Sequence, residues 1–318
     1  MVRDNTLDIV AGIFIVRIIL GHYMSLLHLN ESLLYRSMNI LFFFMPWFFF
    51  KSGMFCSEQR KDVKSLLLPY VFFSIVGIVI AASVALINES SLPSTLLGEC
   101  KTLVLKQAIH FNAPLWFLLS LCFVRVFFNC IRNAINHYLL LGSSLLFAFL
   151  HYLFLAKHGL YWPGNLCSGL AFYILGMKLK DLQYNKKIVI SSLIVLVTIG
   201  IFRPTIVTMY GNILLYENGI YLLWYPFCLA GIIAFNNLIK YAGFILEHFH
   251  FDDIGHHSMI YYVMHWPIGL LIIAIYQKTT PAPNNWELLI YMFLINLVVL
   301  PLLTYLFNLR RMAKFIGK

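Results

Sequence analysis

The chain alternates long apolar runs with short polar connections. Each run has about 17–25 residues, the length that an α-helix needs to cross the hydrocarbon core of a bilayer. The pattern predicts an all-α polytopic membrane protein, with its helices in one bundle and a single domain over residues 1–318. Ten helices are expected, near residues 7–27, 38–56, 69–88, 114–131, 138–155, 163–179, 188–202, 219–236, 258–276 and 286–308.

The connections predict which segments lie outside the membrane. The longest outer segments are expected at about 89–113 and 203–218, and the longest inner loop at 237–257. The first apolar run contains Asp8, Arg17 and His22, and no small-residue cleavage pattern follows it. We therefore expect it to remain as a helix and not to be removed as a signal peptide.

The composition supports lipid as the solvent for most of the chain. Charged residues make up 11% of the sequence and hydrophobic residues 61%, whereas soluble domains carry about 25% charged residues. The mean hydropathy is +0.81. The six cysteines lie mostly within apolar runs and lack the paired spacing of a zinc site, so they are expected to be small core residues.

The net charge is +10, and the basic residues fall in the short gaps between apolar runs. This placement favours contact with anionic lipid headgroups over binding of nucleic acid. Lys and Arg are retained on the cytoplasmic face of a membrane. With both termini inside, the inner segments hold fourteen of them and the outer segments six. We therefore expect a multi-pass protein of the inner (cytoplasmic) membrane with both termini in the cytoplasm.

The first predicted helix carries three ionisable side chains. Each costs at least ~2.5 kcal/mol in hydrocarbon and so calls for a partner or a function. A helix turns by 100° and rises by 1.5 Å per residue, so Asp8 and His22 are only about 40° apart around the helix axis and about 21 Å apart along it. Arg17 lies about 140° around the axis from His22 and faces a different neighbour. A neutral imidazole suits proton transfer near neutral pH, so His22 is the candidate base, with Asp8 on its stripe. The alternative is a histidine satisfied by hydrogen bonds between helices.

A second group of basic residues gathers near the predicted inner surface. Such side chains can hold the phosphates of a nucleotide-bearing donor, or they can serve only as topology anchors and snorkelling side chains. Gly53, beside them, permits a close approach between helices or a local break. The candidate donor-binding residues are Lys51, Ser52, Arg60, Lys61, Lys64 and Arg125.

A third group lies toward the outer face and the membrane centre. Asn112 and Trp116 suit a sugar platform or an interfacial belt. His265 is expected near mid-membrane in a helix with Ser258 as its N-cap, where it either binds substrate or repairs backbone hydrogen bonds broken by Pro267. Arg17 joins these as a candidate substrate-binding residue. The loop EHFHFDDIGHH before this helix matches no helical zinc motif, and we expect no metal.

Five segments together resemble one family. They are LDIVAGIFIVRIILGH at 7–22, FFFKSGMF at 48–55, KDVKSLLLPY at 61–70, APLWFLLSLCFVR at 113–125 and SMIYYVMHWPI at 258–268. In this order they resemble acyltransferase family 3, and in particular its branch of fucose and polysaccharide O-acetylases. The resemblance spans nearly the whole chain.

The resemblance implies the function. Acetyl-CoA would be the acyl donor, a hydroxyl of a cell-surface or lipid-linked carbohydrate the acceptor, and membrane lipids the other partners. His22 matches the family's essential histidine and would act as general base, with an acetyl-histidine intermediate as the alternative. The family usually has Arg or Lys eleven residues before that histidine, and this chain has Ala11. Lys51 is the candidate replacement for that charge.

Two other functions compete with this one. A transporter or flippase for a lipid-linked sugar would line its path with Asp8, Arg17, His22 and His265. A catalytically silent relative would bind a glycan or partner without chemistry, which the change at Ala11 suggests.

Overall fold

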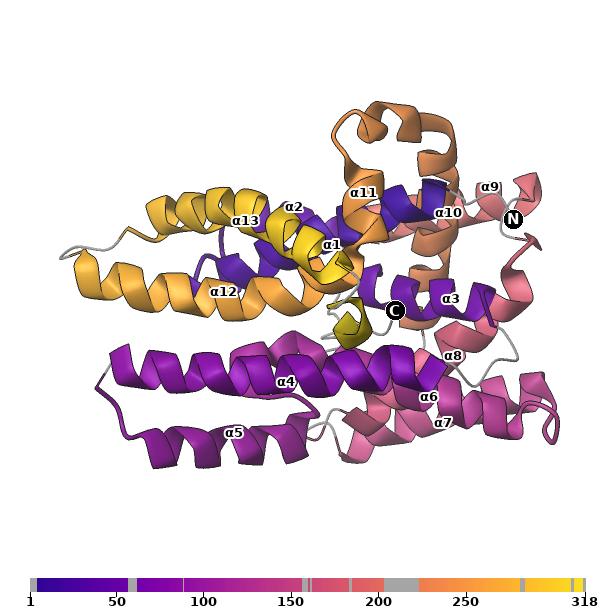
Figure 1. Cartoon of the computed structure of the whole chain (residues 1–318). Helices are drawn as coiled ribbons and strands as arrows, with labels where there is room; N and C mark the ends of the chain where they lie inside the picture. The colour runs from indigo at the N-terminus through magenta and orange to yellow at the C-terminus, as the bar shows by residue number, and fades with distance from the viewer. Residues whose placement is uncertain are drawn as a thin grey trace. The chain divides into compact units, whose positions relative to one another are not determined.

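The computed structural model describes residues 5–56, 62–87, 89–155, 160, 162–182, 185–202, 223–280, 284–309 and 312–316. Within these ranges every regular element is a helix (Figure 1). The predicted all-α class is therefore confirmed. The longer helices are α1 (Asn5–Leu26), α3 (Phe44–Met54), α4 (Asp62–Ile87), α5 (Leu92–Lys106), α6 (Trp116–Ile131), α7 (His137–Phe154), α8 (Trp162–Leu179), α9 (Lys186–Phe202), α10 (Trp224–Glu247), α12 (Ser258–Thr279) and α13 (Asn285–Asn308).

Short helices join some of these elements: α2 (Leu33–Met38), η1 (Asn39–Leu41), η2 (His110–Leu115), α11 (Phe251–His256) and η6 (Ala313–Ile316). Each of the ten predicted membrane helices overlaps one of the longer helices. Among the described residues, eight helical stretches are long and apolar enough to cross a membrane. The chain is thus a multi-pass membrane protein. The predicted number of ten is not confirmed, because α8 and α9 are not among the eight stretches that meet the length and hydropathy criteria.

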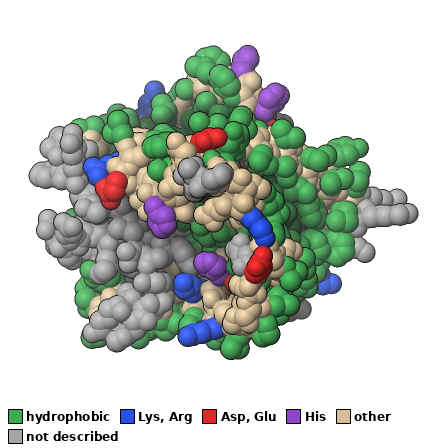
Figure 2. Space-filling view, turned by 90° about the vertical axis from the view of Figure 1, so that its left-hand side faces the viewer, with side chains coloured by type: hydrophobic (Ala, Val, Ile, Leu, Met, Phe, Trp, Pro, Cys, Tyr) green, Lys and Arg blue, Asp and Glu red, His purple; other side chains and the backbone are tan. Residues whose placement is uncertain are grey.

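The outer surface of the helices is apolar. Hydrophobic side chains cover much of the face drawn in Figure 2. Leu97 and Val104 on α5 are 73% and 77% exposed, and Val298 on α13 is 69% exposed. Since large exposed apolar patches are unfavourable in water, these side chains are suited to lipid.

The predicted inner loop over 237–257 is wrong. Helix α10 continues to Glu247, and α11 follows at Phe251–His256. The expected helix ended at residue 236, where Asn236 and Asn237 lie, but the side chains of both are hydrogen-bonded inside the longer helix. Trp47 Nε1 donates to Asn236 Oδ1 over 2.8 Å, and Asn237 Nδ2 donates to the carbonyl of Ile233, also over 2.8 Å. A buried amide with such partners does not interrupt a helix.

Two smaller differences concern the extent of helices. The expected outer segment 89–113 contains the helix α5. This helix begins after Ser91 with a proline in its first turn and ends where Gln107 adopts a positive φ of 60°, and both features are typical of helix boundaries. The predicted N-cap at Ser258 is wrong by one residue, because His257 holds that position and makes no side-chain capping bond.

The chain forms two compact units that are interleaved in sequence. Unit 1 comprises residues 1–14, 39–60 and 123–256, and unit 2 comprises residues 15–38, 61–122 and 257–318. Helices α1 and α6 each contribute residues to both units. The prediction of a single domain stays a prediction.

In unit 1, α3 and α8 approach so closely that glycine is required on both. A Cβ on Gly53 would lie 1.9 Å from the carbonyl oxygen of Tyr173, and one on Gly176 would lie 2.0 Å from that of Phe50. Of the two alternatives at Gly53, the structure shows the close approach. Large side chains fill the rest of this unit, where Trp47, Phe49, Phe50 and Phe172 are fully buried.

Candidate active site

The polar centre of unit 2 is a pair of histidines from α1 and α12. Nδ1 of His22 lies 2.8 Å from Nε2 of His265. The two ring planes differ by 16°, and their centroids are 5.1 Å apart. That separation is the N···N distance plus the two ring radii, so the rings meet head on in nearly one plane. This is the geometry of a linear hydrogen bond and not of stacked rings.

The two rings differ in their access to the surroundings. His265 is completely buried, and its Nδ1 lies 3.0 Å from the carbonyl oxygen of Tyr261, one turn earlier in α12. His22 is only partly exposed, and the edge of Trp266 packs against it at 5.1 Å with the ring planes at 88°. Of the pair, His22 is the more exposed residue.

The α12 turn that carries His265 is held in place by polar contacts with α1 and η2. Tyr23 Oη donates to the carbonyl of His265 over 2.8 Å. Trp266 Nε1 donates to the carbonyl of His110 over 2.9 Å, and Tyr262 Oη donates to that of Pro114 over 2.7 Å. These bonds hold the backbone of α12 around His265 in place and so fix the position of its imidazole beside His22.

Pro267 breaks the backbone ladder of α12, and Asn112 repairs it. Proline has no N–H, so the carbonyl of Val263, four residues earlier, lacks its helical partner. Asn112 Nδ2 donates to that carbonyl over 3.0 Å and to the carbonyl of Phe73 over 3.4 Å. The alternative in which His265 makes the repair is wrong, because its ring bonds the carbonyl of Tyr261 instead.

The other outer candidates are buried as well. Asn112 is completely buried, and Trp116 is 4% exposed and packs edge to face against Phe117. Arg17 is 8% exposed, and its Nη1 lies 3.1 Å from the position that a Cβ on Gly21 would take. The guanidinium interacts electrostatically with His22 and with Tyr35. Glycine at position 21 thus leaves room for a positive charge one turn before His22.

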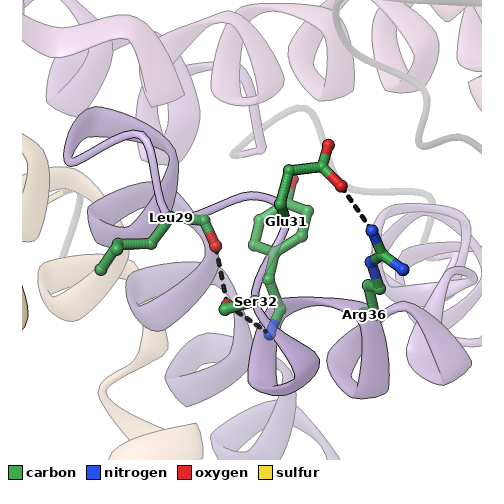
Figure 3. Close-up of polar contacts among 5 residues, drawn as sticks. Leu29, Glu31, Ser32 and Arg36 are labelled. Atoms are coloured by element: carbon green, nitrogen blue, oxygen red, sulfur yellow. Dashed lines mark hydrogen bonds and ion pairs between the residues drawn. The ribbon is translucent and has the colours of Figure 1, made fainter.

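The chain turns directly after α1, which ends four residues after His22, and the polar contacts of this turn are drawn in Figure 3. Ser32 Oγ donates to the carbonyl of Leu29 over 2.7 Å and accepts from the backbone of Tyr35 over 3.2 Å, which caps α2. Glu31 and Arg36 form an exposed ion pair beside it. Such an exposed pair contributes little to stability in water, so replacing Glu31 by a cysteine for chemical labelling should not disturb the fold.

The inner candidates in unit 1 centre on Lys51. Its Nζ lies 3.4 Å from Asp8 Oδ1, donates to the carbonyl of Leu7 over 3.2 Å, and sits 5.2 Å from the ring centroid of Trp47. This ammonium lies beside the first turns of α1, one turn before the fully buried Ala11. That Lys51 replaces a positive charge at residue 11 stays a prediction.

The remaining donor candidates do not form one described cluster. Ser52 and Arg125 are partly buried in unit 1, and Lys64 is exposed in unit 2. Arg60 and Lys61 lie outside the described residues.

Sequence interpretation missed three residues around the histidine pair. Tyr261 supplies the carbonyl that fixes His265, Trp266 packs against His22, and Tyr23 anchors the backbone of His265. Tyr261 lies four residues before His265, a spacing at which a side chain can reach the carbonyl one turn back, and this was the available signal.

Comparison with known proteins gives the chemical class. A family model described as an acyltransferase domain, that of acyltransferase family 3, matches residues 4–305, nearly the whole chain. None of the curated proteins and none of the solved structures compared with the chain matches it. With a match of this extent over a multi-helix membrane fold, the chain belongs to acyltransferase family 3 and is a membrane acyltransferase.

Proposed function

We propose that this protein transfers an acetyl group from cytosolic acetyl-CoA to a hydroxyl of a cell-surface or lipid-linked carbohydrate, with His22 as general base. Membership of the family supports acyl transfer. The observation that carries the role of His22 is its position: a histidine that is not fully buried, in a membrane helix, hydrogen-bonded at one ring nitrogen to a buried histidine. An ionisable group that costs energy in the bilayer calls for a function.

The proposed reaction needs one proton carrier. His22 takes the proton of the acceptor hydroxyl while that oxygen attacks the thioester carbonyl, and it returns the proton to the CoA sulfur as the C–S bond breaks. Positioned acid–base help of this kind contributes ~10²–10⁴-fold to the rate. Arg17, whose charge interacts with His22, is suited to stabilise the oxyanion that develops on the carbonyl.

The donor is proposed to bind through the inner basic residues. In unit 1, Lys51 and Arg125 would attract the phosphates of CoA, and Ser52 would add a hydroxyl. Arg60, Lys61 and Lys64 stay donor candidates on the sequence alone. Asp8 pairs with Lys51, so its proposed part is to orient that ammonium.

The acceptor residues divide by burial. Because Asn112 and Trp116 are buried, we propose that they support the acceptor site from behind. Arg17 is buried as well, so we propose that the partly exposed His22 meets the sugar and that Arg17 acts beside it through its charge.

The experiment is acetyl transfer from radiolabelled acetyl-CoA by purified protein to a panel of glycans. Wild-type protein should give acetylated product, and His22→Ala should lose ~10²-fold or more of the rate. His248→Ala, which removes an exposed histidine at the end of α10, is the matched control and should keep full activity. Transfer by His22→Ala at the wild-type rate would show that the base is another group. Movement of an unmodified glycan without acetyl-CoA would instead identify a transporter.

A further inference from the structure

We propose that His265 is a positioning residue: it fixes the tautomer of His22 with the proton on Nδ1 and leaves the lone pair of Nε2 for the substrate. The proposal deepens the proposed function and rests on it for its catalytic consequence. The tautomer itself follows from contacts within unit 2, whatever acceptor is used.

The first step is set by a backbone carbonyl. The carbonyl oxygen of Tyr261 can only accept a hydrogen bond. It lies 3.0 Å from Nδ1 of His265, so this nitrogen must carry a hydrogen. A neutral imidazole has one N–H, and the Nε2 of His265 is therefore an acceptor.

The second step passes this assignment to His22. Nε2 of His265 faces Nδ1 of His22 at 2.8 Å, with the rings nearly in one plane. Since Nε2 of His265 accepts, Nδ1 of His22 must donate. The single proton of a neutral His22 is then on Nδ1, and its Nε2 carries the free lone pair.

The neutral state of His265 follows from its surroundings. Its side chain is fully buried, and its recorded polar partners in the described part of the chain are backbone carbonyls of the preceding turn and the imidazole of His22. A cation there would lack a carboxylate partner, and the guanidinium of Arg17 adds a further positive charge near the pair. Burying an unpaired charge is far costlier than burying a neutral ring with both nitrogens bonded.

The chain of hydrogen bonds from the carbonyl of Tyr261 through His265 to His22, here called the relay, also accounts for the proton that the reaction moves. When Nε2 of His22 takes the hydroxyl proton, the ring becomes an imidazolium that still donates from Nδ1 to His265. The acceptor oxygen forms its bond to the carbonyl carbon, the C–S bond breaks, and the sulfur leaves with the electron pair. The proton then passes from Nε2 to that sulfur, and the original tautomer returns. The opposite tautomer would present an N–H to the hydroxyl and would lack a base.

The kinetic test compares His265→Phe with His265→Gln. Phenylalanine removes the acceptor, so kcat should fall by about 10²–10⁴-fold, as expected when a general base loses the group that fixes its tautomer. Glutamine offers Oε1 as an acceptor and should recover most of that loss. KM for the acceptor should stay unchanged in both variants. A raised KM with unchanged kcat would overturn the proposal and make His265 a substrate-binding residue.

The structural test is independent of activity. Histidine ¹⁵N chemical shifts of the protein in lipid, with the His22 signals assigned by their absence in His22→Ala, should report the Nδ1–H tautomer in the wild type and its loss in His265→Phe. Tyr70→Phe, which removes a hydroxyl bond to the carbonyl of Gln107 elsewhere in unit 2, is the control and should keep the tautomer. An Nε2–H signal for His22 in the wild type would refute the relay. If the tautomer is found but no acetyl transfer occurs, the proposed function fails and the relay stands.

Discussion

At the scale of single residues, Asn112 shows how a proline is accommodated in a membrane helix. Its amide bonds the carbonyl that Pro267 leaves open and a second carbonyl from α4. In hydrocarbon no water can replace such a bond. A polar residue that suited a sugar platform in the sequence is thus used to complete the backbone of the helix that carries His265.

This role predicts a coupling between Asn112 and Pro267. Asn112→Ala should lower the free energy of unfolding by about 1–3 kcal/mol, because the buried carbonyl of Val263 loses its donor and that of Phe73 loses an additional one. In a Pro267→Ala background the same change should cost less, since the alanine has a backbone N–H that can donate to the carbonyl of Val263. Thermal unfolding of the four proteins in detergent measures the coupling. Equal costs in both backgrounds would show that the amide does not serve the proline break.

At the scale of elements, the contact between α3 and α8 depends on two glycines that face opposite backbones. Each removes a side chain where the partner helix presents a carbonyl oxygen, at 1.9 Å and 2.0 Å from the missing Cβ. Small residues allow this approach, and close packing then contributes to helix association where no hydrophobic drive exists.

We therefore expect Gly53→Ala and Gly176→Ala each to destabilise the protein by about 1–3 kcal/mol through overpacking. The double variant should lose less than the sum, because the separation forced by the first methyl group makes room for the second. Gly142→Ala on α7 is the matched control: nothing lies within 4 Å of its Cβ, and the helix should gain up to about 1 kcal/mol. The unfolding temperatures of the single and double variants test this prediction. An unfolding temperature of Gly53→Ala equal to that of the wild type would contradict the close contact between α3 and α8.

The helices themselves could largely be predicted, since long apolar runs have one stable form in a bilayer. Two elements could not. Helix α10 continues through Asn236 and Asn237 because partners elsewhere in unit 1 and one turn back satisfy them. Helix α5 contains Glu99 and Lys101, which break its apolar run, yet Glu99 is buried and accepts from the backbone of Phe111. Both depend on tertiary contacts that hydropathy does not register.

The candidate site could be predicted in part. Residue type and resemblance singled out His22, and His265 was chosen for its place in an apolar helix. Their hydrogen bond was not predicted, because 243 positions separate them and no local periodicity relates residues so far apart. Asp8 and Lys51 were likewise chosen separately, and the structure brings them into an ion pair.

At the scale of the whole molecule, the charge bias predicts the orientation in the membrane. In a cysteine-free background, single cysteines at Glu31 and Asn212 should react with an impermeant maleimide on intact cells, whereas those at Asn185 and Lys318 should need permeabilisation. Glu31 is suited to the test because its side chain is 88% exposed. Asn212 and Lys318 lie outside the described residues. The reverse labelling pattern would contradict cytoplasmic termini and an inner donor site.

The interleaving of the two units bears on how the protein is made. Ribosomes add about 5–20 residues per second, so roughly 10–50 s pass between the synthesis of His22 and that of His265, 243 positions later. During this interval α1 has left the ribosome with its imidazole unpaired, and the segments that complete unit 2 begin only at residue 257. We therefore expect the first helix to stay at the insertion machinery or in contact with a chaperone during this interval. A nascent chain arrested before α12 should remain crosslinked there through α1, while one that includes α12 should be released.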